Sequence, residues 1–397
     1  MTDDQPRVIV VGGSMGGLTA ALVLRELGMR VDVFERSPEL LDGRGAGIVL
    51  QPDTVRWFRE HGGTGAVDKV STGSSHLRYI GAGNEIVFDE PSTWRFTSWT
   101  TTYKALLADF GTDHYHLGEH CAGLDQDADG VDLRFVSGRE ERADLVAFVD
   151  GISSTGRRRL LPEVVPQYSG YVGWRGTVPE TEVSAATHAL LSDSLAYATA
   201  PNTHICMYPI PGKGGALAAG ERELNYVWYR NVPEGPQLDE LLTDKRGFPS
   251  PVSVHPGQVQ DRYITELRAA AQEQLPPAAA ELVTRTAEPF IQPVLDVEVP
   301  RMAFGRVAIM GDAAFAARPH AAAGTAKAAA DAWALADALR SADGDVTAAL
   351  AKWEPGRLEL GRSLLERVRE MGRKYQVDST ADPADRSLRF GLYGPDQ

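Results

Sequence analysis

The spacing of apolar residues predicts that the chain opens with a strand, a helix and a second strand. Residues 7–11 form an apolar run typical of a buried strand, and apolar positions from Leu18 to Leu27 recur at helical spacing until Gly28. Residues 31–35 form a second strand-like run. A helical connection of this length joins parallel strands, so the pattern predicts a βαβ unit and an α/β fold.

Further along the chain, alternating patterns predict antiparallel sheet. Residues 77–80 and 85–88 alternate on either side of a Gly-rich turn, which is typical of a β-hairpin. More strand-like runs follow, separated by Pro and Gly turns, at residues 171–178, 196–199, 204–210 and 225–229. This series predicts a separate sheet domain inserted into the α/β domain.

The last third of the chain returns to the first pattern. Strand-like runs at 294–299 and 306–310 precede helical patterns at 324–340 and 346–374, and the tail beyond Val377, rich in Asp, Pro, Gly and Ser, is expected to be loosely held. The predicted fold is therefore a Rossmann-like cofactor domain, an inserted, mostly antiparallel β-sheet domain for substrate, and C-terminal helices. The predicted division assigns 1–75, 101–167 and 293–342 to the cofactor domain, 76–100 and 168–292 to the substrate domain, and 343–397 to the C-terminal helix and tail.

Composition and charge exclude several classes of protein. The 397 residues suffice for two or three domains at about 150 residues each. The net charge of -14 repels nucleic acid phosphates and anionic membranes. An acidic N-terminus and the lack of a long apolar run argue against a signal peptide or a membrane span. Two cysteines, Cys121 and Cys206, are too few for a disulfide framework or a zinc site, so a cytoplasmic protein without metal is expected.

The first candidate ligand site is the glycine turn after the opening strand. Gly12 permits a tight turn, Gly17 allows close packing of the helix, and free N–H groups at the helix start can bind a pyrophosphate. Ser14 occupies the place of the usual middle glycine. Glu35, at the end of the second strand, is placed to accept both ribose hydroxyls of an adenosine. The alternative is an ordinary Gly-rich turn.

Two further motifs follow predicted strands. Residues 150–157, which begin Asp150-Gly151, come after the apolar run 145–149, and by themselves they are equally consistent with a common Asp-Gly turn. Gly311-Asp312 follows the run 307–310, and the helix that starts near Gly324 directs its positive end toward whatever precedes it. Taken alone, this third motif is also consistent with a simple lead-in to a helix.

Together and in this order, the three motifs resemble the class A flavoprotein monooxygenases, the single-component FAD-dependent aromatic hydroxylases. The resemblance implies FAD as cofactor, NADH or NADPH as transient co-substrate, and transfer of a hydroxyl group from a flavin C4a-hydroperoxide, formed with O2, to an electron-rich aromatic or heteroaromatic ring. It also implies that FAD is bound by residues of the three motifs and of the loop near residue 47, namely Gly12, Ser14, Met15, Gly17, Glu35, Arg36, Arg44, Gly47, Asp150, Arg157, Asp312, Pro319, Gly324 and Thr325.

Within this class the chain is most similar to the dihydroxypyridine hydroxylases. The shared segments span nearly the whole chain and include residues 11–14, 94–98, 170–176, 208–212 and 318–324. The likeness implies a substrate of hydroxypyridine or phenol type. One departure concerns the helix near residues 102–110, where Tyr103 and Lys104 stand in place of an Arg that the class uses for a FAD phosphate, and whether they replace it is left open.

His320, Tyr208 and Tyr171 are the candidate catalytic residues. His320 precedes the helix at Gly324 and is the best candidate to hydrogen-bond the substrate or relay its proton, the alternative being a structural loop histidine. Tyr171 and Tyr208, with Trp174 and Trp228, recur on the predicted sheet as cavity wall or as sheet core. Arg175 is expected to close a polar network rather than to touch the substrate. Alternatives for the whole chain are epoxidation or oxidative rearrangement by the same chemistry, or a redox-inert flavin-binding or ligand-binding protein; a homodimer is possible.

Overall fold

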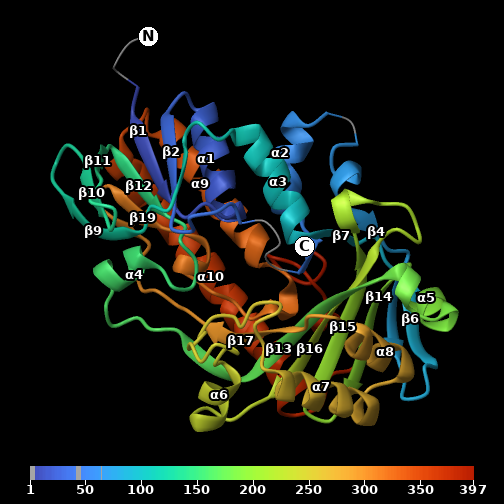
Figure 1. Cartoon of the computed structure of the whole chain (residues 1–397). Helices are drawn as coiled ribbons and strands as arrows, with labels where there is room; N and C mark the ends of the chain where they lie inside the picture. Colours follow the sequence, from blue (N-terminus) through green and yellow to red (C-terminus); the bar gives the residue numbers. More distant parts are fainter. Residues whose placement is uncertain (1–4, 42–45, 64) are drawn as a thin grey trace.

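Two large sheets lie side by side in the computed structural model, which describes residues 5–41, 46–63 and 65–397. In Figure 1 the six-stranded sheet lies at the upper left and the seven-stranded sheet at the lower right. Both belong to an α/β chain, as the sequence predicts. Within the described residues, no helix combines the length and the apolar character that a membrane crossing demands.

The six-stranded sheet contains the predicted βαβ unit. β1 pairs in parallel with β2 on one side and with β12 on the other, and β12 pairs in parallel with β19. The strand order is β18, β19, β12, β1, β2 and β8, and the bounds are Ala303–Phe304, Val307–Ile309, Leu145–Phe148, Arg7–Val11, Arg30–Glu35 and Tyr115–Leu117. The carboxyl ends of β1, β2, β12 and β19 therefore meet at one edge, which is the edge where all three predicted motifs begin.

Each face of this sheet is covered. Helices α1 (Met15–Glu26), α9 (Gly324–Ser341) and α10 (Val346–Gln376) share one hydrophobic core with inward-facing residues of β1 and β2, and α3 (Trp99–Phe110) and α2 (Pro52–His61) extend that core. The other face packs against a three-stranded sheet of β9 (Cys121–Gln126), β10 (Val131–Phe135) and β11 (Glu140–Ala143). The motif edge is thereby held between two rigid layers.

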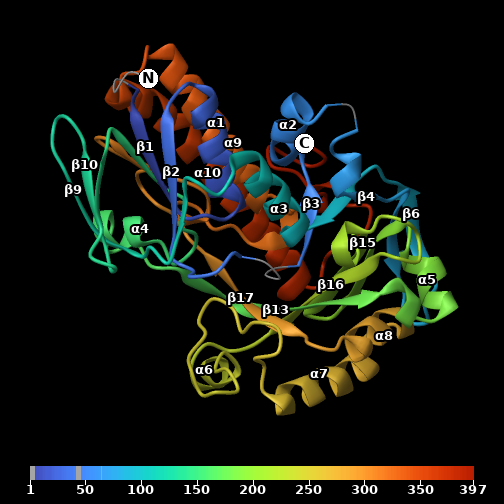
Figure 2. The same cartoon turned by 45° about the horizontal axis from the view of Figure 1, so that its top comes forward.

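The seven-stranded sheet has two different faces because its side chains alternate. Trp174, Trp228 and Ile205 point to one side, where they form a core with α7 (Asp261–Gln274) and α8 (Pro277–Arg285). Figure 2 shows these helices against the outer face, away from the six-stranded sheet. The strand order is β17 (Phe290–Asp296), β13 (Gln167–Pro179), β16 (Glu223–Asn231), β15 (Thr203–Ile210), β14 (Ser194–Ala200), β5 (His76–Ile80) and β6 (Ile86–Pro91).

The remaining elements are short. A small sheet joins β3 (Gly47–Leu50), β7 (Arg95–Ser98) and β4 (Thr72–Gly73) and contacts β15 and α3, and α4 (Thr155–Leu160) follows β12. Two short helices, α5 (Ala185–Leu191) and α6 (Pro236–Leu241), follow β13 and β16 in the chain. Single turns of 3-10 helix occur as η1 (Asp68–Val70), η2 (Glu180–Glu182), η3 (Lys213–Gly215), η4 (Gly311–Ala313), η5 (Pro319–Ala321) and η6 (Arg386–Leu388).

Most predicted elements are present, and two predictions need correction. The hairpin at residues 77–88 is confirmed as antiparallel β5 and β6. The strand expected at 294–299 instead begins at Phe290 and pairs with β13 in the seven-stranded sheet, where its edge position tolerates Pro293. The predicted division into domains remains a prediction.

The expectation of a loosely held tail is wrong. Leu388, Phe390 and Leu392 are only 4%, 5% and 3% exposed, and the Arg389 guanidinium lies 2.8 Å from the Glu90 carboxylate. The polar composition of the segment conceals three alternating apolar residues whose burial anchors it. The chain end therefore lies between the two large sheets, beside α2 and α3 (Figure 1).

A buried ion pair inside α9 ties this helix to the motif edge. The Lys327 ammonium lies 2.7 Å from the Asp331 carboxylate, and both side chains have no solvent exposure. Asp331 Oδ2 accepts from the Gly311 N–H at 3.0 Å, and Lys327 Nζ donates to the Gly311 carbonyl at 3.3 Å. The pair therefore holds both backbone groups of the glycine that precedes Asp312.

We expect Lys327→Met to lower the free energy of unfolding by about 3–5 kcal/mol, because the Asp331 charge is then buried without its partner. Methionine keeps the length of the side chain, so loss of volume contributes little. Thermal or denaturant unfolding measures the effect. The control is Arg340→Met, whose pair with Asp337 lies on the surface, with a change of about 0.5 kcal/mol or less. Equal changes in the two variants would contradict this account.

Candidate active site

Two cavities meet at the motif edge of the six-stranded sheet. The larger, about 510 Å³, extends from the β1–α1 turn toward the β13 side of the seven-stranded sheet, and the smaller, about 190 Å³, lies under that sheet beside α9 and α10. Six residues line both and define the junction: Gly47, Ile48, Arg175, Asp312, Gly324 and Thr325. A ligand in the larger cavity can therefore present one end to the contents of the smaller one.

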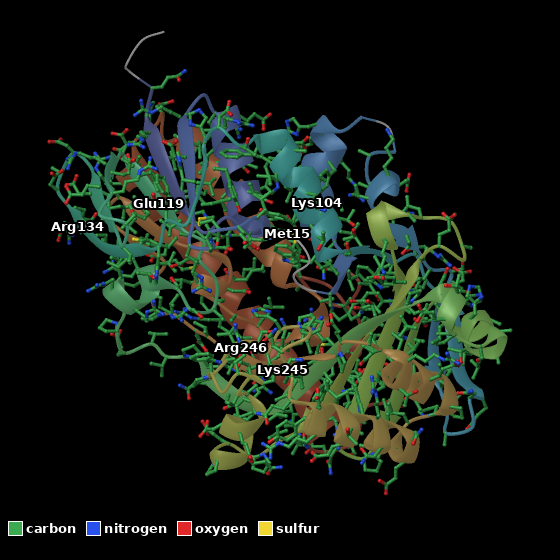
Figure 3. All side chains as sticks on the ribbon, in the orientation of Figure 1. Met15, Lys104, Glu119, Arg134, Lys245 and Arg246 are labelled. Atoms are coloured by element: carbon green, nitrogen blue, oxygen red, sulfur yellow. The ribbon has the colours of Figure 1, made fainter. Side chains whose placement is uncertain are left out.

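The first motif forms a tight turn at one end of the larger cavity. Gly12 has a positive φ of 109°, and a Cβ there would lie 2.5 Å from the Val149 carbonyl oxygen, so only glycine fits. A Cβ on Gly17 would overlap the Gly12 carbonyl, which explains the close helix packing and places Gly17 beneath the turn, outside the cavity lining. Ser14 and Met15 line the cavity, and Figure 3 labels Met15 at the inner end of α1, between the sheets.

Glu35 is fixed at the end of β2 by backbone donors. Its Oε2 accepts from the Gly13 N–H and its Oε1 from the Ser37 N–H, each at 2.8 Å, and it is 7% exposed. Each carboxylate oxygen still has acceptor capacity for a hydroxyl group. Arg36, also on the wall, is exposed. The arrangement fits the two hydroxyls of a ribose.

The second motif contributes Asp150 to the cavity and uses Arg157 elsewhere. Asp150 Oδ2 accepts from the Thr155 N–H at 2.6 Å, whereas Oδ1 is buried without a hydrogen-bond partner among the described residues, and burial raises the pKa of this carboxyl. The Arg157 guanidinium donates to the carbonyls of Ala313 and Ile152 and does not line either cavity. Arg157 therefore joins the second motif to the third.

Asp312 and the start of α9 form the floor of the junction. The Asp312 side chain is exposed to the cavities, and desolvation by the surrounding protein raises the pKa of its carboxyl despite the positive charge of Lys327. Helix α9 begins at Gly324 without a side-chain cap, so its positive end is open toward Asp312 and Thr325. Across the junction, the Gly47 N–H donates to Asn225 Oδ1 at 2.8 Å.

Four other residues singled out in the sequence complete the comparison. Pro319 lines the smaller cavity and not the larger one. Arg44 lies outside the described residues. Tyr103 is buried, and its hydroxyl lies 3.2 Å from that of Tyr115, which donates to the Gly13 carbonyl at 2.8 Å. Tyr103 therefore supports the glycine turn from behind, and Lys104, labelled in Figure 3, lines neither cavity.

The smaller cavity receives two of the three candidate catalytic residues. Tyr208 lines it and stacks on Phe96 with ring centroids 4.5 Å apart, and burial raises the pKa of its phenol. His320 also lines it, and burial, followed by the charge of Arg318, lowers its pKa to about 3. Tyr171 is not part of the lining, but its hydroxyl lies 2.7 Å from His320 Nε2. Trp174 and Trp228 face the opposite core.

Several cavity residues escape sequence analysis. Phe390 comes from the tail, Tyr375 from α10, and Tyr197, His204 and Tyr229 from strands of the seven-stranded sheet, and all five line the smaller cavity. Side-chain alternation along the strands carries a signal for the last three. In the larger cavity the missed residues include Trp99, Glu119, His120, Cys121, Ser253, His255 and Gln292. Figure 3 labels Glu119.

Among the described residues, Arg175 closes no polar network, contrary to the sequence expectation. It projects from β13 into the junction, and the described part of the chain provides it with no hydrogen bond or ion pair. The network that does exist links Arg318 with Asp296 at 3.0 Å and Arg369 with the same carboxylate at 3.1 Å. A guanidinium without a partner at the meeting point of two cavities is available to a ligand.

The larger cavity fits FAD in both shape and chemistry. Its glycine turn leaves no room for a Cβ, its carboxylates Glu35 and Asp312 face inward, and Asp150 has a buried oxygen without a partner. Hydroxyl groups of a ribose and a ribityl chain satisfy such acceptors, and the open end of α1 suits a pyrophosphate. Within residues 5–41, 46–63 and 65–397, no group of three His, Cys, Asp or Glu side chains is placed to bind a metal ion.

Comparisons with known proteins agree with this geometry. A family model described as FAD binding domain-like matches residues 168–296, and one described as pyridine nucleotide-disulphide oxidoreductase matches residues 7–50. The chain is 40% identical to 2,6-dihydroxypyridine 3-monooxygenase of Paenarthrobacter nicotinovorans over 99% of its own length and 97% of the relative's. It is 28% identical to 6-hydroxynicotinate 3-monooxygenase of Bordetella bronchiseptica, covering 83% of this chain and 81% of the other.

Solved structures show the same likeness. The structure of 2,6-dihydroxypyridine-3-hydroxylase from Arthrobacter nicotinovorans superposes with a TM-score of 0.93 at 39% identity, over 100% of this chain and 99% of the other. Klebsiella pneumoniae HpxO complexed with FAD and uric acid superposes with a TM-score of 0.78 at 22% identity, over 98% and 91% of the two chains, which shows a shared fold.

We expect Asp312→Ala and Glu35→Ala each to weaken FAD binding by about 10- to 150-fold, because each removes a charged hydrogen-bond acceptor from the cavity wall. Titration of the apoprotein with FAD, followed by flavin fluorescence, measures the effect. Glu273→Ala, on the outer helix α7, is the control and leaves affinity unchanged. Wild-type affinity in both cavity variants would show that these carboxylates do not hold the cofactor.

Proposed function

The chain belongs to the family of FAD-dependent aromatic monooxygenases, and from that premise we propose that it hydroxylates an electron-rich hydroxypyridine ring. The resemblance to class A flavoprotein monooxygenases noted in the sequence is thereby confirmed. The observation that carries the substrate proposal is the smaller cavity, an aromatic chamber that shares the junction residues with the larger cavity. The 40% identity to a dihydroxypyridine monooxygenase supports the same ring class.

The size and lining of the smaller cavity favour a single ring. A cavity of about 150 Å³ in another protein holds benzene, and this one measures about 190 Å³. Tyr197, Tyr208, Tyr229, Tyr375 and Phe390 line it, so ring contacts can hold a flat substrate. Bound FAD supplies the redox chemistry, namely acceptance of hydride from NADH or NADPH and activation of O2 for insertion of one oxygen atom into the ring.

His320 is proposed to hold a proton at one defined nitrogen. Arg318 donates to the Tyr171 hydroxyl oxygen at 3.5 Å, so the Tyr171 proton is directed to its other neighbour, His320 Nε2, at 2.7 Å. Because its pKa is lowered to about 3, His320 is neutral near pH 7, and an Nε2 that accepts leaves the proton on Nδ1. Nδ1 is buried and has no partner among the described residues.

This tautomer gives the cavity a fixed N–H donor. We propose that Nδ1–H of His320 hydrogen-bonds a ring oxygen of the substrate and relays the proton that this oxygen exchanges during hydroxylation. The histidine acts without becoming an imidazolium, because burial disfavours the charged form. Tyr171 is then a positioning residue that sets the tautomer from behind the cavity wall.

A substrate screen tests the proposed function. Hydroxypyridines, phenols and hydroxybenzoates are added to the FAD-loaded protein with NADH or NADPH, and substrate-dependent nucleotide oxidation is followed with mass analysis of the product under labelled O2. We expect strong stimulation by 2,6-dihydroxypyridine or a close hydroxypyridine, with one labelled oxygen in the product. Stimulation by phenols alone, or products lacking the label, would contradict the proposal.

We expect His320→Ala to keep FAD bound and to slow product formation by about 10²–10⁴-fold, with more hydrogen peroxide released per NAD(P)H consumed. Product and peroxide are measured at saturating substrate. Tyr171→Phe, which frees the tautomer but leaves the imidazole in place, should reduce coupling less. Wild-type coupling in both variants would assign His320 and Tyr171 to structure and leave Tyr208 as the remaining candidate.

Location and assembly stay proposals. We infer a cytoplasmic location, supported by the need for NADH or NADPH and by two buried cysteines that are not disulfide-bonded. A homodimer remains a prediction that light scattering of the purified protein can check.

A further inference from the structure

Arg175 belongs to a row of side chains that crosses the inner face of the seven-stranded sheet. Register pairs Phe290 with Arg175, Arg175 with Val227, Val227 with Cys206, and Cys206 with Tyr197. Phe290 lines the larger cavity, and Val227, Cys206 and Tyr197 line the smaller one. Arg175 stands at the crossing and lines both, so its position is set by strand register rather than by a flexible loop.

The guanidinium of Arg175 has no partner in the described structure, which distinguishes it from other inward-facing cations. The guanidinium of Arg157 bonds two carbonyls, and that of Arg318 is paired with Asp296. Asp312 lies across the junction, yet no ion pair joins it to Arg175. A partly buried cation without compensation is costly, so the loaded enzyme is expected to place an anion beside it.

Apart from Asp312, the titratable groups that line the smaller cavity with Arg175 cannot supply that anion. They are Cys206 and Tyr208 on β15, Tyr229 on β16, Tyr197 on β14, His204 on β15, His320 on η5 and Tyr375 on α10. Burial raises the pKa of the tyrosines and the thiol and lowers that of the histidines, so all of them are neutral near pH 7. Among the described residues of this cavity, Arg175 is thus the single cation and Asp312, at the junction, the single anion.

We propose that Arg175 selects the substrate by binding its ring as the monoanion, with one ionised ring oxygen beside the guanidinium. The ring hydroxyl releases its proton to solvent on binding, and the O⁻ that remains is paired with the cation. An ionised ring is more electron-rich, so the same contact favours attack by the ring on activated oxygen. This inference rests on the proposed function and names the residue that determines which rings it accepts.

The cofactor is the competing anion, and the fold gives it other donors. The open N-terminus of α9 at Gly324 and Thr325 offers backbone N–H groups at the junction. The row that contains Arg175 continues into the smaller cavity through Val227 and Cys206. Arg175 thus stands at the mouth of the smaller cavity, between Phe290 on the side of the larger cavity and Val227 on the side of the smaller one. Because the cofactor has donors of its own at α9, this position favours the substrate as the partner of Arg175.

Ligand absorbance tests the proposal without turnover. Oxidised, FAD-loaded enzyme is titrated with 2,6-dihydroxypyridine under anaerobic conditions and without nucleotide, at a series of pH values, and the bound ring is identified as neutral or ionised from its ultraviolet spectrum. In the wild type we expect the bound ring to ionise at least one pH unit lower than the free ring, a tenfold preference for the anion. A methoxypyridine that cannot ionise serves as the neutral probe.

Three variants complete the design. Arg175→Met should weaken binding of the ionisable ring by about 10- to 150-fold and abolish the shift in its ionisation, while affinity for the methoxypyridine changes less than about threefold. Arg175→Lys should restore part of the shift because it keeps the charge. Arg230→Met, on β16, is the matched control, since Arg230 packs on Trp228 and lines neither cavity, and it should leave both ligands unaffected.

The outcomes are distinct. An ionisable ring that binds the wild type and Arg175→Met equally, or that stays neutral when bound, overturns this inference and leaves the proposed function standing. Loss of FAD or a shifted flavin potential in Arg175→Met, with unchanged ionisation of the ring, assigns Arg175 to the cofactor and also overturns it. Failure of hydroxypyridines and phenols alike to bind the wild type contradicts the proposed function and this inference together.

Discussion

The arrangement of the site depends on the hydrogen bonds that α9 forms with the backbone of Gly311. Lys327 and Asp331, one helical turn apart, are both fully buried, and together they bind the N–H and the carbonyl of Gly311. This contact sets the distance between the end of β19 and the start of α9. Asp312 and the positive end of the helix therefore face the same space, so a ligand at the junction meets a carboxylate and a row of N–H donors at once.

Side chains of the seven-stranded sheet alternate between two faces, and each face has its own role. Its outer face, with Trp174 and Trp228, builds the stability of the domain against α7 and α8. Its inner face, with Tyr197, Tyr208 and Tyr229, builds the chamber for the ring. Because neighbouring residues on one strand serve opposite faces, the chamber wall can vary in sequence without any change to the core behind it.

Sequence patterns predict the parts of this fold that are set by residues close together in the sequence. The βαβ unit, the glycine turn and the carboxylates at strand ends follow from spacing alone, and the structure brings Gly12, Glu35, Asp150 and Asp312 to one cavity. The pairing of Tyr171 with His320 joins residues 149 positions apart, and the place of Arg175 requires the register of four other strands. Such contacts are tertiary, and no local period encodes them.

The tail shows how composition can mislead and what it means for the enzyme. Its Asp, Pro, Gly and Ser content suggested weak anchoring, whereas the alternation of Leu388, Phe390 and Leu392 decides its burial. Arg157 is a second case. It belongs to a motif expected to bind a ligand, yet its guanidinium joins two loops by donating to the carbonyls of Ala313 and Ile152. In both cases the side chain's geometry, and not its type, determines the role.

The segment that follows α10 serves the core and the ring chamber with side chains two residues apart. Leu388 and Leu392 belong to the hydrophobic core that α1, α9 and α10 share, whereas Phe390, between them, lines the chamber. The two leucines therefore fix the position of the phenyl ring. A substitution at Phe390 can reshape the chamber while the segment stays in place, whereas a substitution at either leucine disturbs the core and the chamber wall together.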